Sequence, residues 1–229
     1  MTGSPTEPKR LRHGYTNATT VEGRRVVKRY LGPDAPERRS REVRALTLLA
    51  GRFPVPPLIE SDESQVVLAF VPGVHGQEIL EEGPEEILFE VGRAGRTLHE
   101  LDLRAAYEGA DGSVLLLHGD FGPQNMLFDE GTLHMQALVD WEFTHAGDPV
   151  EDLAWAEWIV RTHHPHLAKA LDALFAGYGH RPTWQRRQNA MLDKCRWALD
   201  VVRRWSATIN ATSVAMWEQR LEATARFRE

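Results

Sequence analysis

The sequence predicts an α+β protein in which a small, β-rich part with one helix precedes a larger, mainly helical part. Short runs rich in β-forming residues dominate residues 18–71, and helical periodicity dominates from Pro84 onward. The dipeptide Pro72-Gly73 breaks the chain between the two patterns. The resulting domain prediction has three parts: a disordered tail at residues 1–10, a first lobe at residues 11–72 and a second lobe at residues 73–229.

The first lobe is expected to contain four short strands and one helix. Glu22-Gly23 separates the first two β-type runs and has the residue types of a hairpin turn. The helix is expected at residues 37–50, where apolar residues recur at helical spacing and Gly51 follows as a stop signal. The expected strands are residues 18–21, 24–29, 58–60 and 65–71.

The second lobe reads as a helical unit with a β insertion near its start. Its first helix is expected at residues 85–103. Gly92 and Gly95 are unusual inside a helix, and they suggest close packing against a neighbouring element. The remaining predictions are strands at residues 114–117, 126–128 and 133–139, and helices at residues 149–162, 165–177, 183–206 and 213–228.

Composition favours an ordinary globular protein in a reducing compartment. Hydrophobic residues make up 42% and charged residues 26% of the 229 residues. The single cysteine, Cys195, excludes a disulfide within one chain and a thiolate-based metal site. No apolar run approaches the roughly 20 residues that span a bilayer, and residues 1–9 lack the apolar core of a signal peptide. We therefore expect a cytoplasmic protein with no membrane partner, and both a monomer and a homodimer stay open.

The net charge of −6 is unevenly distributed along the chain. Residues 1–60 hold 12 Lys and Arg against 6 Asp and Glu, whereas residues 61–229 hold 15 against 27. The basic part would attract an anion such as a nucleotide and the acidic part a cation, although charged surfaces also serve only to keep a protein soluble. Binding of nucleic acid is disfavoured, because the arginines are scattered and the whole chain is acidic.

The densest polar cluster follows an apolar strand, in the segment His-Gly-Asp-Phe-Gly-Pro-Gln-Asn at residues 118–125. A second strand ends in Asp140, 15 residues beyond Asn125. Acidic and amide side chains thus emerge from two neighbouring strand ends, and such oxygen ligands suit a hard cation such as Mg²⁺. The alternative is a polar turn between core strands in which these side chains only cap backbone groups.

The order His-x-Asp-x4-Asn, followed by an aspartate at the end of the next strand, is the arrangement of protein kinases and their relatives. Its first part reads His-Gly-Asp here, and in this it resembles the aminoglycoside-phosphotransferase and choline-kinase-like family. The segment Gly-Asp-Pro-x2-Asp-Leu-Ala at residues 147–154 looks like the next block of that family. The resemblance implies a protein-kinase-like two-lobe fold, with nucleotide bound by the first lobe and the acceptor by the second.

The resemblance also implies a reaction, the transfer of the γ-phosphoryl group of ATP to a hydroxyl group. Asp120 would accept the proton of that hydroxyl, and Asn125 and Asp140 would hold Mg²⁺. GTP is not excluded as the nucleotide.

Three further residues are expected to support this loop. His118 is expected to be a hydrogen-bonded scaffold residue rather than a proton carrier. Asp152 is expected to accept backbone hydrogen bonds from around His118. Glu142 would be an outer partner of the metal or a substrate contact, unless it is a plain surface acid.

In the first lobe the resemblance implies a strand lysine that contacts the α and β phosphates and a helix glutamate that pairs with it. Lys28 and Glu42 match these positions. Arg25 and Arg29 compete with Lys28 as neighbouring strand cations, and Glu37 competes with Glu42 on the same helix.

Two further segments of the first lobe are expected to contact the nucleotide. Gly-Tyr-Thr-Asn at residues 14–17 resembles the phosphate-covering loop of choline-kinase-like members, so Thr16 and Asn17 would bond phosphate oxygens; the alternative is a simple turn before a strand. The segment at residues 67–73 looks like the hinge that binds adenine, with one backbone donor and one backbone acceptor supplied by Ala69 and Val71.

The expected partner is a small-molecule acceptor such as an aminoglycoside, an amino alcohol or a related metabolite, with a cationic acceptor favoured by the acidic second lobe. Most tryptophans are expected in the core, although one or two of them would suit a pocket wall that faces a cation. The alternative function, from another class, is a nucleotide-binding pseudokinase or regulatory module without transfer activity. The intact aspartates and asparagine argue against it.

Overall fold

The structure, a computed structural model, describes residues 9–10, 17–101, 115–205 and 211–229. Thr16 and most of the predicted tail lie outside these residues. The last two residues of that tail, Lys9–Arg10, form strand β1, which pairs with β2. Among the described helices, none has the length and apolar character needed to cross a membrane.

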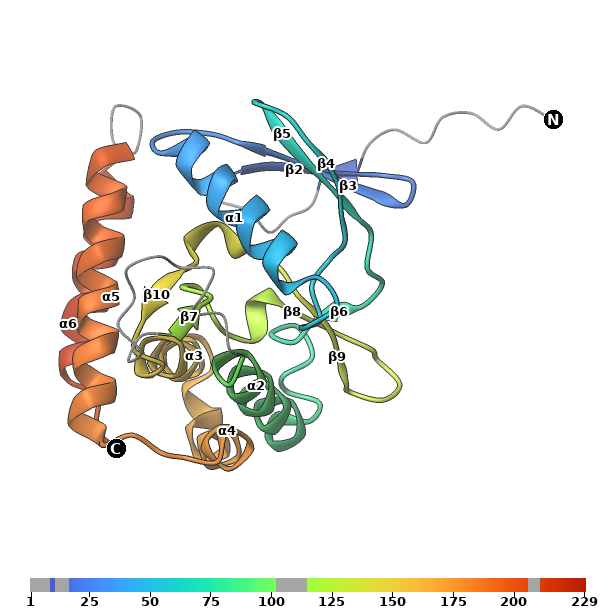
Figure 1. The fold of residues 1–229 in the computed structure, drawn as a ribbon. Coiled ribbons are helices and arrows are strands. Elements are labelled where there is room, and N and C mark those ends of the chain that lie inside the picture. Colours follow the sequence, from blue (N-terminus) through green and yellow to red (C-terminus); the bar gives the residue numbers. More distant parts are fainter. Residues whose placement is uncertain (1–8, 11–16, 102–114, 206–210) are drawn as a thin grey trace.

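The first lobe is an antiparallel five-stranded sheet in the order β1-β2-β3-β5-β4, with one helix beside it (Figure 1). Strand β3 is central, and its Lys28 faces Thr19 of β2 and Val66 of β5. The Lys28 side chain is buried on the sheet face where it reaches Glu42 of the helix, whereas Arg25 and Arg29 of the same strand are exposed. The elements are β2 (Asn17–Glu22), β3 (Arg25–Tyr30), α1 (Ala35–Leu49), β4 (Leu58–Ser61) and β5 (Gln65–Ala69).

The second lobe is mainly helical and includes two small sheets. One sheet has the order β6-β8-β9 and the other pairs β7 with β10. In Figure 1 the last two helices run side by side along one flank, next to α3. The helices are α2 (Pro84–His99), α3 (Val150–His163), α4 (Leu171–Tyr178), α5 (Trp184–Trp205) and α6 (Ala211–Ala225). The strands are β6 (Val74–His75), β7 (Leu115–Leu117), β8 (Met126–Phe128), β9 (Met135–Leu138) and β10 (His145–Gly147).

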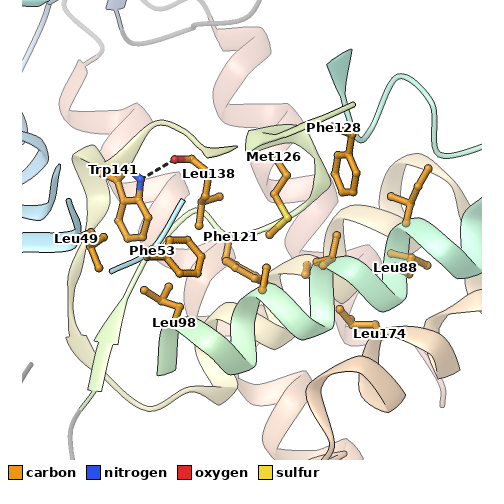
Figure 2. Packing of buried hydrophobic residues seen from close by; sticks show 14 of the residues in the cluster. Leu49, Phe53, Leu88, Leu98, Phe121, Met126, Phe128, Leu138, Trp141 and Leu174 are labelled. Carbon is orange, nitrogen blue, oxygen red and sulfur yellow. Dashed lines mark hydrogen bonds between the residues drawn. The ribbon is translucent and has the colours of Figure 1, made fainter. Parts of the chain in front are cut away.

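One hydrophobic cluster joins the two lobes. Leu46 and Leu49 of α1 are buried in it together with Leu88 and Leu98 of α2. Figure 2 shows how Leu49 and Phe53 lie next to Trp141, whose indole nitrogen donates to the carbonyl oxygen of Leu138. Because the apolar face of α1 is covered by residues of both lobes, the lobes are packed as one body.

The close helix packing predicted from Gly92 is present. A Cβ atom on Gly92 would lie 2.0 Å from the carbonyl oxygen of Leu174 in α4. The reciprocal contact joins Gly177 of α4 to the carbonyl oxygen of Phe89, at 2.1 Å. Only glycine allows the backbones of α2 and α4 to approach this closely.

These elements confirm the predicted α+β class, and they differ from the predictions in detail. The segment predicted as one helix at residues 165–177 is a 3₁₀ helix, η4 (Pro165–Ala170), followed by α4. Strands β6 and β10 were not predicted. They contain two and three residues, and alternation of apolar and polar residues cannot be recognised over so short a run.

Candidate active site

The segment at residues 118–125 connects β7 to β8 and carries the predicted base. Its Gly119 has a φ of +81°, and a Cβ atom there would lie 2.2 Å from the carbonyl oxygen of Phe143. No side chain fits against a backbone group at that distance, so this turn requires glycine. The approach brings the loop against the segment that follows Asp140.

Both carboxylate oxygens of Asp120 accept hydrogen bonds that fix its direction. Trp155 Nε1 donates to Oδ1 over 2.7 Å, and Asn125 Nδ2 donates to Oδ2 over 2.8 Å. Burial raises the pKa of Asp120 to about 6, although the attraction of Lys194 opposes this rise. A carboxylate held in one direction, with a pKa near physiological pH, is suited to accept a proton.

Asn125 and Asp140 are brought together by the pairing of β8 with β9. Met126 faces Leu138 in this ladder, and the Val139 N–H group donates to the carbonyl oxygen of Asn125 over 2.8 Å. The residue before β8 and the second residue after β9 therefore lie at the same edge of the sheet.

The donor atoms at this edge fit a magnesium ion. Asn125 Nδ2 donates to the carbonyl oxygen and to Oδ2 of Asp120, which leaves Asn125 Oδ1 without a hydrogen bond from the described residues. The Asp140 side chain is 30% exposed, and its backbone is left-handed with a φ of 69°. Such strain in a non-glycine residue is typical of functional sites. The described residues contain no group of three or more His, Cys, Asp or Glu side chains suited to a metal. One carboxylate and one amide leave room for substrate phosphates on Mg²⁺.

Lys28 connects the first lobe to this metal edge. Its Nζ lies 2.5 Å from Glu42 Oε2 and 2.5 Å from Asp140 Oδ1. Although burial opposes it, the two carboxylates hold the pKa of Lys28 well above its usual range, so the lysine is charged. The competing residues Arg25 and Arg29 are exposed, whereas Lys28 is only 6% exposed.

Asn17 and Glu142 belong to a second buried cluster that also joins the lobes. Glu142 is completely buried, so it is not a plain surface acid. Its Oε2 accepts hydrogen bonds from Asn17 Nδ2 over 2.9 Å and from Arg38 Nη1 over 2.7 Å. Arg38 Nη1 also donates to Asn17 Oδ1 over 3.2 Å. The Asn17 side-chain amide, which was predicted to bind a phosphate oxygen, is thus hydrogen-bonded to Glu142 and Arg38 in this cluster.

Asp152 holds the turn before the base. Its Oδ2 accepts the His118 N–H group over 2.8 Å, and its Oδ1 accepts the Gly119 N–H group over 2.9 Å. His118 is completely buried, and burial lowers its pKa, so the ring is neutral. Its Nδ1 accepts from the Asp120 N–H group, and its Nε2 therefore donates to the carbonyl oxygen of Val139 over 2.9 Å. A neutral ring with both nitrogens in hydrogen bonds to the backbone is suited to hold this loop in place.

The predicted hinge follows β5. The Ala69 N–H group donates to the carbonyl oxygen of Pro57 over 2.9 Å. An adenine contact by Ala69 would therefore use its carbonyl oxygen, and the donor would have to come from Val71. Val71 lies beyond the end of β5 and is partly exposed.

Comparison with known families explains this arrangement. The profile of the "Phosphotransferase enzyme family" matches residues 7–113 and 104–189 of the chain. The chain belongs to this phosphotransferase family. The match includes the predicted base Asp120, the predicted metal ligands Asn125 and Asp140 and the Lys28–Glu42 pair, and it confirms the family resemblance seen in the motifs.

Solved structures of low sequence identity share the fold of this phosphotransferase. The GDP and kanamycin complex of APH(2'')-IIIa has a TM-score of 0.73 and 14% identity, over 98% of this chain and 95% of that one. The gentamicin complex of APH(2'')-IIa has a TM-score of 0.71 and 12% identity, over 97% and 92%. A choline/ethanolamine kinase family protein from Mesorhizobium loti has a TM-score of 0.69 and 17% identity, over 97% and 89%. These likenesses confirm the kinase-like two-lobe fold. Among curated protein sequences none matches the chain significantly.

Four residues that contact the site of this phosphotransferase were not assigned there from the sequence. They contact it only through the tertiary fold, so no local motif marks them. Trp155 alone offers a signal, because it directly follows the Asp-Leu-Ala end of the motif at residues 147–154. The four are Arg38, which donates a hydrogen bond to Glu142; His99, whose Nε2 lies 3.2 Å from Asp152 Oδ2; Trp155, which donates to Asp120; and Lys194, whose positive charge lowers the pKa of Asp120.

Proposed function

We propose that this phosphotransferase moves the γ-phosphoryl group of ATP to a hydroxyl group of a small molecule, with Asp120 as the base. The observation that supports this best is the contact between Asp120 and Asn125 beside the charged group formed by Lys28, Glu42 and Asp140. A base, two oxygen ligands and a phosphate-binding lysine are the parts that phosphoryl transfer requires.

Each residue has one task in the proposed reaction. Asp120 accepts the proton of the acceptor hydroxyl while the oxygen of that hydroxyl forms a bond to the γ-phosphorus. At the same time, the bond between the γ-phosphorus and the β–γ bridging oxygen breaks. The products are ADP and a phosphate monoester. Lys28 holds the α and β phosphates, and Glu42 keeps its ammonium group in place. Mg²⁺, held by Asn125 and Asp140, would neutralise the charge on the phosphate oxygens.

The nucleotide and the general class of acceptor are proposed from the same site and its relatives. Solved structures of similar phosphotransferases contain ATP, ADP or GDP, so transfer activity should be measured with ATP and with GTP. Relatives in complex with gentamicin and kanamycin support a hydroxylated small molecule as acceptor.

The first test is release of ADP across a panel of hydroxylated acceptors, with and without Mg²⁺. Asp120→Asn is expected to lower turnover by about 10²–10⁴-fold, the usual contribution of a positioned base. It should leave the Kd of Mg·ATP nearly unchanged, because Asp120 is not a proposed metal ligand. Full activity of Asp120→Asn would refute the assignment of the base.

The second test addresses the metal edge. Asp140→Asn is expected to weaken the binding of Mg·ATP by removing the only charged metal ligand, as measured by calorimetry. Asp200→Asn, an exposed position on α5, serves as the matched control. Equal affinity of both variants for Mg·ATP would contradict the metal site. Mg²⁺-independent nucleotide binding with no transfer to any acceptor would instead support a pseudokinase.

A further inference from the structure

Lys194 of helix α5 lies close to the proposed base and has no task in the reaction described above. Its Nζ is 3.7 Å from the ring centroid of Trp197, 5.6 Å from that of Phe143 and 5.8 Å from that of Trp155. Three aromatic rings are thus within cation–π distance of one ammonium group. Within the described part of the chain, Lys194 forms no hydrogen bond or ion pair.

The contacts of Asp120 separate two sides of the base. Its Oδ2 faces Asn125, which belongs to the metal edge where the phosphates are proposed to bind. Its Oδ1 faces Trp155, and the ring of Trp155 is one of the three around Lys194. Lys194 is therefore on the Trp155 side of Asp120, away from the proposed metal ligands. The acceptor hydroxyl has to approach Asp120 from this side, because the phosphates are proposed to bind on the other.

A half-buried ammonium group that forms no ion pair with a carboxylate of the described residues favours an anionic ligand. Burial lowers the pKa of Lys194, and the attraction of Asp120 opposes this only in part. An anion that approached the ammonium would restore the interactions lost on burial. A cation at the same place would instead be repelled, and the aromatic rings that would receive it already hold the ammonium of Lys194.

We propose that the acceptor carries a carboxylate or phosphate group near the hydroxyl that is phosphorylated, and that Lys194 binds this anion. The inference rests on the proposed function and narrows it. It departs from the cationic acceptor expected from the acidic charge of the second lobe, because the net charge of a lobe says less about the acceptor than a charged side chain on the acceptor side of the proposed base.

Two series of compounds that differ mainly in charge test the proposal. The first comprises glycerate, glycerol 3-phosphate, glycerol and 3-amino-1,2-propanediol. The second comprises gluconate, glucose 6-phosphate, glucose and glucosamine. Binding to the full chain with Mg·ADP is measured by calorimetry, and phosphorylation with Mg·ATP by ADP release. We expect an anionic member to bind best in at least one series, and comparison of its carboxylate and phosphate members distinguishes the two anions.

Lys194→Met tests the residue itself, because methionine keeps the length of the side chain and its contacts with the rings. The variant is expected to weaken binding of the anionic member roughly 10- to 100-fold, the contribution of one charged hydrogen bond, and to leave the neutral member unchanged. Lys194→Arg should restore much of this loss. Lys169→Met, at an exposed position of η4, is the matched control and should change neither.

Three outcomes would overturn the proposal. The first is that no anionic compound binds more tightly than its neutral counterpart. The second is that Lys194→Met weakens neutral and anionic compounds equally. The third is that it lowers turnover of all acceptors without changing their binding, which would place Lys194 on the transferred phosphoryl group instead. Failure of the proposed function is distinguishable, because it would appear as absence of Mg²⁺-dependent ADP release with every compound.

Discussion

Asp152 shows how one buried carboxylate that takes no part in the proposed reaction can hold the turn before the proposed base. Burial alone would raise its pKa, but the hydrogen bonds from His99 and from the His118 N–H group outweigh burial and lower it. A carboxylate whose pKa is lower in the folded than in the unfolded protein stabilises the fold above its unfolded value of about 3.9. This contribution is lost as the pH falls through the lower, folded pKa.

We therefore expect Asp152→Asn to reduce the acid sensitivity of the fold. At pH 7 the variant should be less stable by about 1–3 kcal/mol, since buried N–H groups lose a charged acceptor. Below the unfolded value of about 3.9, its free energy of unfolding should fall less steeply with decreasing pH than that of the wild type, as measured by urea denaturation. The exposed control Asp200→Asn should follow the wild-type curve. Parallel curves for Asp152→Asn and the wild type would contradict the lowered pKa.

At the scale of residues, the sequence could predict the parts of the site that share a local motif. Asp120, Asn125 and Asp140 sit at spacings fixed by strand ends, so their juxtaposition follows from the pattern. Arg38 and Lys194 could not be predicted, because each reaches the site from a helix distant in sequence. Their helices also contain other basic residues at exposed positions, and nothing local distinguishes the ones that face inward.

At the scale of elements, the contact between α2 and α4 depends on two glycines. Gly92→Ala is expected to destabilise the protein by about 1–3 kcal/mol, because the new Cβ atom would overlap the carbonyl oxygen of Leu174 and force the helices apart. The higher helix propensity of alanine offsets only about 1 kcal/mol of this. Gly131→Ala is the matched control, since a Cβ atom there meets its nearest neighbour, Asp129, at 3.5 Å. Equal urea midpoints for the two variants would show that the backbones are not in close contact.

The helices and longer strands were predictable because their residues repeat with a period. Residues 85–103 and 183–206 were expected as helices, and the structure has α2 and α5 there. Strand β10 was missed for a physical reason, since its three residues, His145–Gly147, are held by pairing with β7 rather than by their own propensity. Its place could be known only once the register of that pair was known.

At the scale of the whole molecule, two buried charge clusters hold the lobes in register. Lys28 of the first lobe forms an ion pair with Asp140 of the second. Arg38 of α1 forms an ion pair with Glu142, which is two residues after Asp140 in the sequence. Arg38 and Glu142 are 3% and 0% exposed, so their charges are compensated mainly by the protein. Loss of one partner from a buried ion pair leaves an uncompensated buried charge, which costs free energy. Replacement of both partners by apolar residues removes both charges and so avoids this cost.

Arg38→Met is therefore expected to destabilise the protein by about 3–5 kcal/mol, and the double variant Arg38→Met/Glu142→Leu should recover a large part of that loss. The single variant should also raise the Kd of Mg·ATP, because Lys28 and Asp140, which are proposed to hold the phosphates and the metal, come from opposite lobes and need a fixed separation. Urea denaturation and calorimetry measure the two effects. Arg41→Met is the matched control on α1, where the arginine is exposed. If Arg38→Met matched Arg41→Met in both measurements, the buried cluster would have no part in aligning the lobes, and the metal edge would depend on the shared hydrophobic core alone.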